Sequence, residues 1–393
     1  MSSVFPMPRA AGCPFDPAPE LSREPVSRVR LWDGSTAWMV TGYADVRALL
    51  ADPRVSVDVA QPGFPHTNAV SKARDAQMKT LMQMDAPEHT VHRRMLTADF
   101  RIRKMEELRP GIQRIVDGLV DGMLAGPKPV DLYEVLALPV PSLVICELLG
   151  VPYADRGFFQ RVAGELVMDG GDPARALAAS EELNGYLEEL TERKSAEPGD
   201  DVLSRLAVEQ YRTGRMTRRE IAVMGQLLLV AGHDTTANMI ALGTAALFAH
   251  PDQLAAVKDG ADVAGAVEEL LRYLSITHTE ARRVAREDLV VGGQLIRAGE
   301  GIIAVKSTAN RDPAAFPGGP GALDVRRDAR HHVAFGYGAH QCLGQPLARV
   351  ELQTVFGTLF RRVPTLAPAV PLDELTFKEH AVFYGVRELP VTW

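Results

Sequence analysis

Cysteine is scarce in this sequence. Only Cys13, Cys146 and Cys342 occur in 393 residues, an odd number at wide spacing. Such a set offers no disulfide framework and is typical of a protein in a reducing compartment. We therefore expect a cytoplasmic protein. The scarcity also raises the question of why one thiol, Cys342, lies in a loop with three glycines.

The sequence also has no long apolar segment and no excess of positive charge. Its longest apolar run, residues 221–232, is about half of a membrane span and leads into His233 and Asp234. Residues 1–15 contain too much proline for a signal peptide. The formal net charge is -7, which gives no general attraction to nucleic acid. We expect a monomer with neither a membrane anchor nor a nucleic-acid partner.

Repeats, low-complexity tracts and Gly/Ser-rich linkers are missing as well, so we expect a single domain over residues 1–393. Helical periodicity is strongest in residues 105–124, 180–194, 219–250 and 343–363. Pro251 suits the first turn of another helix. Hairpins are predicted at Asp33-Gly34 and at Gly292-Gly293, and long irregular stretches at 61–78 and 312–332. The predicted fold is mainly α with a small β region.

The loop FGYGAHQCLG, residues 335–344, allows three interpretations of Cys342. A buried small hydrophobe would leave the glycines and His340 unexplained. A zinc site would need more Cys or His side chains at ligand spacing. A thiolate ligand fits better, because a thiol just before a helix has a lowered pKa and the glycines let the backbone approach a flat ligand closely.

Residues 335–349, FGYGAHQCLGQPLAR, match throughout the haem-binding pattern FGxGxHxCLGxxLAR, and in this the chain resembles the cytochromes P450. The similarity extends from residues 38–54 to residues 379–393. It implies the cytochrome P450 fold, with haem b (iron protoporphyrin IX) between a long distal helix and a proximal cysteine loop followed by a helix. It also implies that Cys342 binds the iron, that Phe335 and Gly344 lie beside the cofactor, and that the thiolate favours O-O cleavage.

The segment AGHDTT, residues 231–236, lies in the middle of the predicted helix 219–250. A glycine, a charge and two threonines are unfavourable inside an apolar helix, and such local conflicts often mark function. The resemblance implies that Gly232 loosens the helix beside the iron, that Asp234 feeds protons, and that Thr235 hydrogen-bonds bound oxygen.

Glu269 and Arg272 lie three residues apart, on one helix face. The resemblance implies a structural pair that locks the core behind the haem. Its third member in the family is an arginine in a segment like FPDPDRFD, whereas this chain has FPGGPGALD at 316–324. Ala322 takes the arginine's place, so the third member is left unassigned.

The two haem propionates need hydrogen-bond donors. The resemblance implies that His89 and Arg93, which lie four residues apart on one helix face, reach one propionate. Arg283 and His340 match the contacts to the other.

The reaction implied by the resemblance is monooxygenation of an unactivated C-H bond. No flavin or iron-sulfur motif is present, so ferredoxin and its reductase are the expected electron donors, and residues 101–109 with Arg349 are a candidate docking patch. One alternative is an NADH-dependent nitric oxide reductase, because the chain is also similar to that fungal branch. The branch loses the Asp-Thr pair that this chain keeps at Asp234-Thr235. A non-catalytic haem binder or sensor would have no need of such a pair.

By the same resemblance, the substrate pocket is walled by residues 61–83, 163–178, 227–235, 276–280 and 380–385. The expected lining residues are Phe64, His66, Val230, His233, Ile276, His278, Phe383 and Tyr384. Their mixed character suggests a bulky, partly oxygenated small molecule, and we expect a secondary metabolite such as a macrolide. The glycine-rich residues 168–176 are expected to form a mobile roof.

Overall fold

The computed structural model describes residues 4–10, 13–22, 24–69, 71–72, 75, 79–167 and 173–393. The chain forms two compact units. Unit 1 comprises Met1–Thr90, Leu242–Gln345 and Val382–Gly385, and unit 2 comprises Val91–Ala241, Pro346–Ala381 and Val386–Trp393. This division does not test the expectation of a single domain, which stays a prediction.

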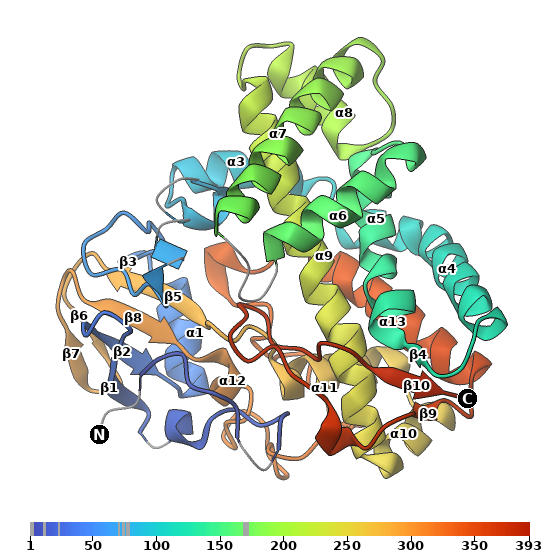
Figure 1. Ribbon diagram of the computed structural model, residues 1–393. Helices are drawn as coiled ribbons and strands as arrows, with labels where there is room; N and C mark the ends of the chain where they lie inside the picture. The colour runs from blue at the N-terminus through green and yellow to red at the C-terminus, as the bar shows by residue number, and fades with distance from the viewer. Residues whose placement is uncertain are drawn as a thin grey trace. The chain divides into compact units, whose positions relative to one another are not determined.

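The largest sheet belongs to unit 1 (Figure 1). Its strands are β1 (Val26–Arg30), β2 (Thr36–Val40), β3 (Val55–Ser56), β5 (Ala281–Ala285) and β8 (Gly301–Ala304). They lie in the order β1-β2-β8-β5-β3, with β2 and β8 parallel and the other neighbours antiparallel. A separate hairpin joins β6 (Leu289–Val291) to β7 (Gln294–Ile296).

Both predicted hairpins are confirmed. Arg30 pairs with Thr36 across the first turn, and Val291 pairs with Gln294 across the second. Gly34 has a φ of +84°, and Gly292 and Gly293 have φ values of +53° and +79°. Only glycine adopts such values without strain, which is why these turns can be read from the sequence.

Side chains of the central strands alternate between two apolar clusters. Val40, Ile302 and Ala304 pack in a cluster with side chains of α1 (Tyr43–Ala51). Met39 and Ile303 point the other way and pack with residues of the N-terminal segment. Because both faces are covered, β2 and β8 are apolar on both sides, as expected for buried parallel neighbours.

Unit 1 also contains several short helices. They are α10 (Pro251–Lys258), α11 (Val263–Leu274), α12 (Lys306–Ala309) and the short turns η1 (Pro19–Ser22), η2 (Leu81–Gln83) and η6 (Gly338–His340). Pro251 lies in the first turn of α10, as predicted. Residues 312–332 form neither helix nor strand, which confirms the second predicted irregular stretch. In the first, 61–78, residues 69, 71, 72 and 75 are helical.

Unit 2 is built mainly from helices. Its α-helices are α4 (Ile102–Ala125), α5 (Pro139–Leu149), α6 (Arg156–Val167), α7 (Pro173–Ala196) and α8 (Val202–Leu206). Two π-helical segments, η3 (Tyr133–Ala137) and η5 (Ala207–Tyr211), and two short 3-10 helices, η4 (Tyr153–Asp155) and η7 (Leu372–Glu374), accompany them. The small sheet consists of β4 (Val130–Asp131), β9 (Ala367–Pro368) and β10 (Pro390–Thr392). Three helices cross the boundary between the units in sequence: α3 (Glu88–Thr97), α9 (Arg218–Ala249) and α13 (Gln345–Arg362). The four helices predicted from periodicity are confirmed as α4, α7, α9 and α13.

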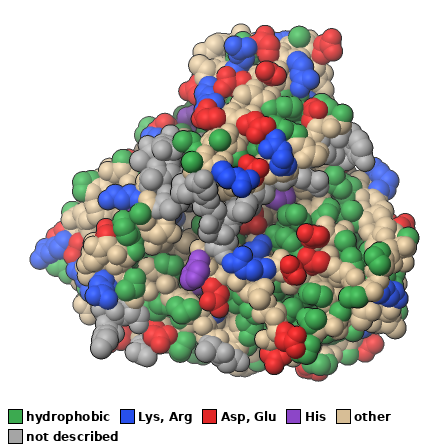
Figure 2. Space-filling view, viewed as in Figure 1, with side chains coloured by type: hydrophobic (Ala, Val, Ile, Leu, Met, Phe, Trp, Pro, Cys, Tyr) green, Lys and Arg blue, Asp and Glu red, His purple; other side chains and the backbone are tan. Residues whose placement is uncertain are grey.

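Charged side chains on α7 are paired. Arg219 contacts Glu181 at 2.6 Å and Glu188 at 3.2 Å, and Arg161 contacts Glu182 at 2.7 Å. Figure 2 shows blue and red side chains interspersed over α7 and α8. This surface therefore presents charges of both signs together. None of the helices that the structure describes is long and apolar enough to cross a bilayer.

Candidate functional site

The cysteine loop leaves its thiol accessible. Cys342 is exposed, and its backbone N-H donates to the Phe335 carbonyl at 2.8 Å, which closes the loop. Gly338 has a φ of +74°, and a Cβ there would collide with the Leu50 carbonyl oxygen. The exposed thiol contradicts the buried-hydrophobe interpretation. The zinc interpretation finds no support either, since no metal-binding group of three or more His, Cys, Asp or Glu occurs among the described residues.

Cationic and imidazole side chains gather in unit 1 near this loop. The rings of His89 and His340 lie 4.0 Å apart, and His89 is 3% exposed. Arg93 lies four residues after His89 on α3 and belongs to unit 2. On β5, burial lowers the pKa of Arg283 to about 10, and its NH1 group donates to the Arg282 carbonyl at 2.8 Å. His89 and His340 thus lie side by side, although the family pattern assigns them to different propionates.

A buried ion pair lies in α11. Glu269 and Arg272 have side chains that are 0% exposed, and the carboxylate accepts two hydrogen bonds from the guanidinium, at 2.6 and 2.7 Å. The remaining Arg272 donors reach the backbone carbonyls of Pro320 and Ala322 in the irregular segment and of Asn310 at the end of α12. This pair therefore holds residues that have no secondary structure of their own.

The structure supplies the arginine that the sequence comparison missed. Arg327 Nε lies 3.4 Å from Glu269 Oε1, and its NH1 group donates to the Pro317 carbonyl at 2.7 Å. At the place where the family pattern has the arginine, Ala322 contributes only its carbonyl. The third charge is Arg327, five residues further on.

In unit 2, the apolar helix α9 carries the buried carboxyl group of Asp234. Asp234 is 7% exposed, and burial raises its pKa while the Lys378 ammonium opposes that rise. Asn238 Nδ2 donates to the Asp234 carbonyl at 2.9 Å. Lys378 Nζ in turn donates to Asn238 Oδ1 at 2.9 Å and to the Tyr133 hydroxyl at 2.8 Å. The four residues form a connected polar network, of which Asp234 alone was anticipated.

The two threonines of α9 have different partners. The Thr235 hydroxyl donates to the Ala231 carbonyl at 2.8 Å. The Thr236 hydroxyl donates to Glu351 Oε2 at 3.3 Å, and burial raises the pKa of Glu351 to about 8. Helix α9 runs unbroken across Gly232, where an added Cβ would lie 3.4 Å from the Ile145 side chain. Gly232 therefore lets α5 approach α9 closely.

The expected substrate-pocket residues fall into three groups. In unit 1, Tyr384 N donates to the Ile276 carbonyl at 2.7 Å and His278 N donates to the Val382 carbonyl at 2.9 Å, so the segments around Ile276 and Phe383 are adjacent. Also in unit 1, the rings of Phe64 and His66 lie 5.2 Å apart.

The third group lies on α9 in unit 2. Val230 is half-buried and His233 is 1% exposed. Burial and the Lys378 charge hold the pKa of His233 at about 4, so its imidazole is neutral at pH 7. Part of the expected roof, residues 168–172, and part of the expected loop, residues 70, 73–74 and 76–78, lie outside the described residues.

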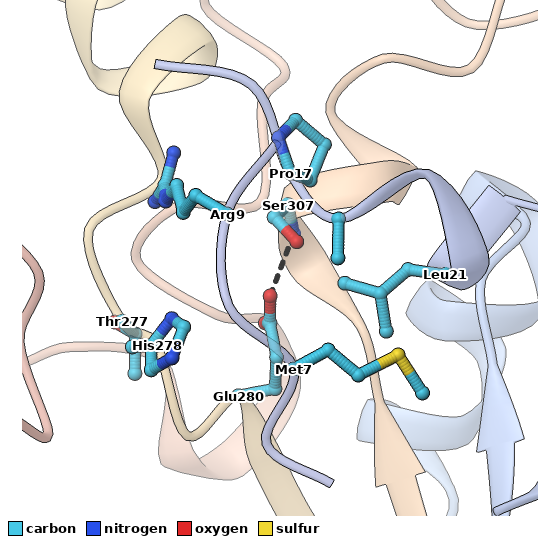
Figure 3. Close-up of a pocket in the computed structure, with 9 residues that line it drawn as sticks. Met7, Arg9, Pro17, Leu21, Thr277, His278, Glu280 and Ser307 are labelled. Carbon is cyan, nitrogen blue, oxygen red and sulfur yellow. Dashed lines mark hydrogen bonds between the residues drawn. The ribbon is translucent and has the colours of Figure 1, made fainter. Parts of the chain in front are cut away.

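A small pocket in unit 1 shares only His278 with the expected lining. Its residues are Met7, Arg9, Pro17, Ala18, Leu21, Thr277, His278, Glu280 and Ser307 (Figure 3). Arg9 donates to the Leu274 carbonyl at 2.7 Å and so ties the N-terminal segment to the end of α11.

Comparisons with known proteins agree with this geometry. Residues 263–369 match the family model of cytochrome P450. Cytochrome P450 GfsF of Streptomyces halstedii is 52% identical over 99% of this chain and 96% of its own length. The chain belongs to the cytochrome P450 family. The crystal structure of GfsF superposes on this P450 with a TM-score of 0.95 and full coverage of both chains.

Further P450 relatives are similar over the whole chain. Cytochrome P450-SU2 of Streptomyces griseolus is 52% identical over 99% of this chain and 97% of its own length. The mycinamicin VIII C21 methyl hydroxylase of Micromonospora griseorubida is 42% identical over 99% of this chain and its full length. Its structure with bound mycinamicin VIII has a TM-score of 0.92 over all of both chains. The protein is thus a P450 monooxygenase with the P450 fold, and its cofactor is haem b.

The residues of unit 1 fit that cofactor. The donor set joins an exposed thiol to imidazoles and a half-buried guanidinium, which suits an iron and two carboxylates. A Cβ at Gly344 would lie 4.0 Å from Cys342 Sγ, so glycine keeps side-chain bulk away from the sulfur.

Arg327→Ala is expected to destabilise the holoprotein by about 1 kcal/mol, because Glu269 keeps both of its bonds to Arg272. Arg272→Ala should cost about 3–5 kcal/mol, because it leaves a buried carboxylate unpaired. Urea unfolding measures both. Arg326→Ala, an exposed neighbour, is the matched control. Equal midpoints for the Arg326 and Arg327 variants would show that the Glu269–Arg327 contact contributes nothing.

Glu351→Gln is expected to change how stability depends on pH. The folded-state pKa of Glu351 is about 8 and the ordinary value is 4.5, so the folded chain binds the proton more tightly. Wild-type stability should therefore fall, relative to the variant, as pH rises from 4.5 to 8, by up to about 1.4 kcal/mol per pH unit.

Thermal unfolding from pH 5 to 9 tests this, with Glu374→Gln as the exposed control. Parallel curves for wild type and Glu351→Gln would contradict the assignment.

Proposed function

We propose that this P450 hydroxylates, or oxidises further, a C-H bond of a bulky secondary metabolite of the macrolide class. The observation that carries the proposal is the full-length similarity to a hydroxylase whose structure holds mycinamicin VIII. The mixture of apolar and polar side chains at Phe64, Ile276, His278 and Tyr384 supports a large ligand with some oxygen atoms.

When bound, haem b activates O2 so that one oxygen atom enters the substrate and the other leaves as water. We infer that the Cys342 thiolate is the iron ligand, beside Phe335 and Gly344. The His89 and His340 pair, Arg93 and Arg283 are inferred to hold the propionates through charge-assisted hydrogen bonds.

Asp234 and Thr235 are proposed to handle the protons of the reaction. Burial raises the pKa of Asp234, which favours a carboxyl that exchanges its proton closer to neutral pH. Lys378 and Tyr133 are half-buried and are joined through Asn238 to the backbone carbonyl of Asp234, and the Lys378 charge also acts on the Asp234 carboxyl. The Thr235 hydroxyl can give up its hydrogen bond to the Ala231 carbonyl at little cost, because Ala231 is exposed and water can bind that carbonyl instead.

Electrons are proposed to come from a ferredoxin and its reductase in the cytoplasm, since the sequence carries no flavin or iron-sulfur motif. The candidate docking patch is weaker than expected. Arg103 pairs with Glu107, Lys104 with Asp99, and Arg109 with Glu106. Residues 101–109 are therefore better described as a solvated helix face, and the surface that binds the donor is left unassigned.

The nitric oxide reductase alternative receives no support from the relatives with named activities, which include a synthase and hydroxylases. The intact Asp234-Thr235 pair also argues against it and against a non-catalytic haem binder.

Titration of the ferric holoprotein with macrolides, terpenoids and flavonoids is expected to give a saturable absorbance shift with macrolides, because a bulky ligand expels water from beside the iron. The Soret band is the readout. A shift with terpenoids or flavonoids and none with macrolides would reject the substrate class while leaving the monooxygenase assignment intact.

Thr235→Ala is expected to leave haem content unchanged and to lower product per NADH roughly tenfold or more, because protons are no longer delivered by a positioned group. The lost electrons should appear as hydrogen peroxide, measured beside product with ferredoxin and reductase supplied. Thr235→Ser keeps the hydroxyl and is the control. Equal product per NADH in wild type and Thr235→Ala would sink the proton-handling role.

A further inference from the structure

Lys306, a buried cation outside the predicted donor set, lies just beyond the end of β8. Lys306 is the first residue of α12 and is 7% exposed. Among the described residues, no hydrogen bond or ion pair reaches its ammonium group. Lysine is almost never buried to this degree without a partner, because its charge loses the solvation of water. The sequence patterns that point to the propionate donors do not include this residue.

The carboxylate with the strongest effect on Lys306 already has partners. Glu280 accepts hydrogen bonds from the backbone amides of Lys306 and Ser307, at 2.7 and 3.2 Å. Figure 3 shows its side chain directed at Ser307. The Glu280 backbone has a φ of +52°, a left-handed value that is uncommon for a residue with a side chain. Glu280 is thus committed to the start of α12 and leaves the ammonium group without a bonded anion.

Lys306 lies among groups of the cofactor site. Burial lowers its pKa, and after Glu280 the groups that act on it are the Arg283 guanidinium and the Cys342 thiol. On the sheet, Ala281 of β5 lies opposite Ala304 of β8, and Arg283 lies opposite Ile302. Lys306 comes two residues after Ala304, just beyond the end of β8. The side chain of Arg283 bonds only to the Arg282 carbonyl among the described residues. Two neighbouring cations, the buried Lys306 and the half-buried Arg283, therefore lack a bound anion.

We propose that Lys306 binds a propionate of the haem, as a donor additional to His89, Arg93, Arg283 and His340. An ammonium group is a compact charge with three donors, which suits a carboxylate held between it and a guanidinium. Binding of the anion would remove the repulsion between Lys306 and Arg283. This inference depends on the haem b cofactor and is independent of the substrate class.

The experiment compares Lys306→Met with Lys306→Arg and uses the ferric holoprotein. We expect haem transfer to apomyoglobin to be about tenfold faster in Lys306→Met, because that variant loses one charge-assisted hydrogen bond. In Lys306→Arg the transfer rate should be close to that of the wild type. The ferric/ferrous potential of Lys306→Met should become more negative, because a positive charge near the iron favours the reduced state. Lys306→Gln is the second variant if the methionine variant does not fold.

Lys194→Met is the matched control, because Lys194 has a side chain only 12% exposed and is paired with Asp201 at 2.6 Å in unit 2. It should lower the unfolding temperature without changing the potential. If Lys306→Met had the same haem transfer rate and the same ferric/ferrous potential as the wild type, the proposal would be overturned. An unchanged transfer rate with weakened binding of a carboxylate-bearing ligand would overturn it too, because the anion would then belong to the substrate.

Discussion

The buried ion pair of Glu269 and Arg272 is the interaction on which unit 1 depends. Residues 312–332 have no hydrogen-bonded regular structure and lead directly into the cysteine loop. Arg272 binds three of the carbonyls around this segment, and Glu269 binds the Asp324 amide and Arg327. A buried pair is tolerable only when every donor and acceptor has a partner. The irregular segment meets that condition, so the pair fixes the path of the chain that carries Cys342.

Unit 2 contains buried polar and ionisable side chains on an apolar helix. Asp234, Thr236 and their partners Lys378 and Glu351 are held in low-dielectric surroundings, where an unpaired charge is unfavourable. Burial shifts the carboxyl pKa values of Asp234 and Glu351 upward, so both groups hold a proton more readily than exposed carboxyls. A fold optimised only for stability would replace these side chains with apolar ones. Buried groups with shifted pKa values are common at functional sites, and this is consistent with the proton chemistry proposed for α9.

Local patterns predicted most of the fold and part of the site. The helices α4, α7, α9 and α13 follow from periodicity, and the hairpins follow from Asp33-Gly34 and Gly292-Gly293. The assignment of Cys342 as iron ligand follows from fixed motif spacing and stays a prediction. Arg327, Glu351 and Lys378 were missed, because each is a single polar group whose partner lies far away in sequence. Lys306 was missed because nothing in its local sequence marks it as buried. No period or motif marks such residues. Only tertiary burial distinguishes Glu351 or Lys306 from an ordinary surface charge.

The same burial links cofactor binding to folding. Arg283 and Lys306 are neighbours, and burial depresses both pKa values, so the chain alone carries two charges that oppose its compact state. An anion that binds only the folded chain stabilises it by mass action. Haem b supplies two such carboxylates, as well as the iron for which Cys342 is the proposed ligand. The unit 1 site is therefore arranged so that the cofactor completes the electrostatics of the fold, and haem retention and stability should be properties of the same set of side chains.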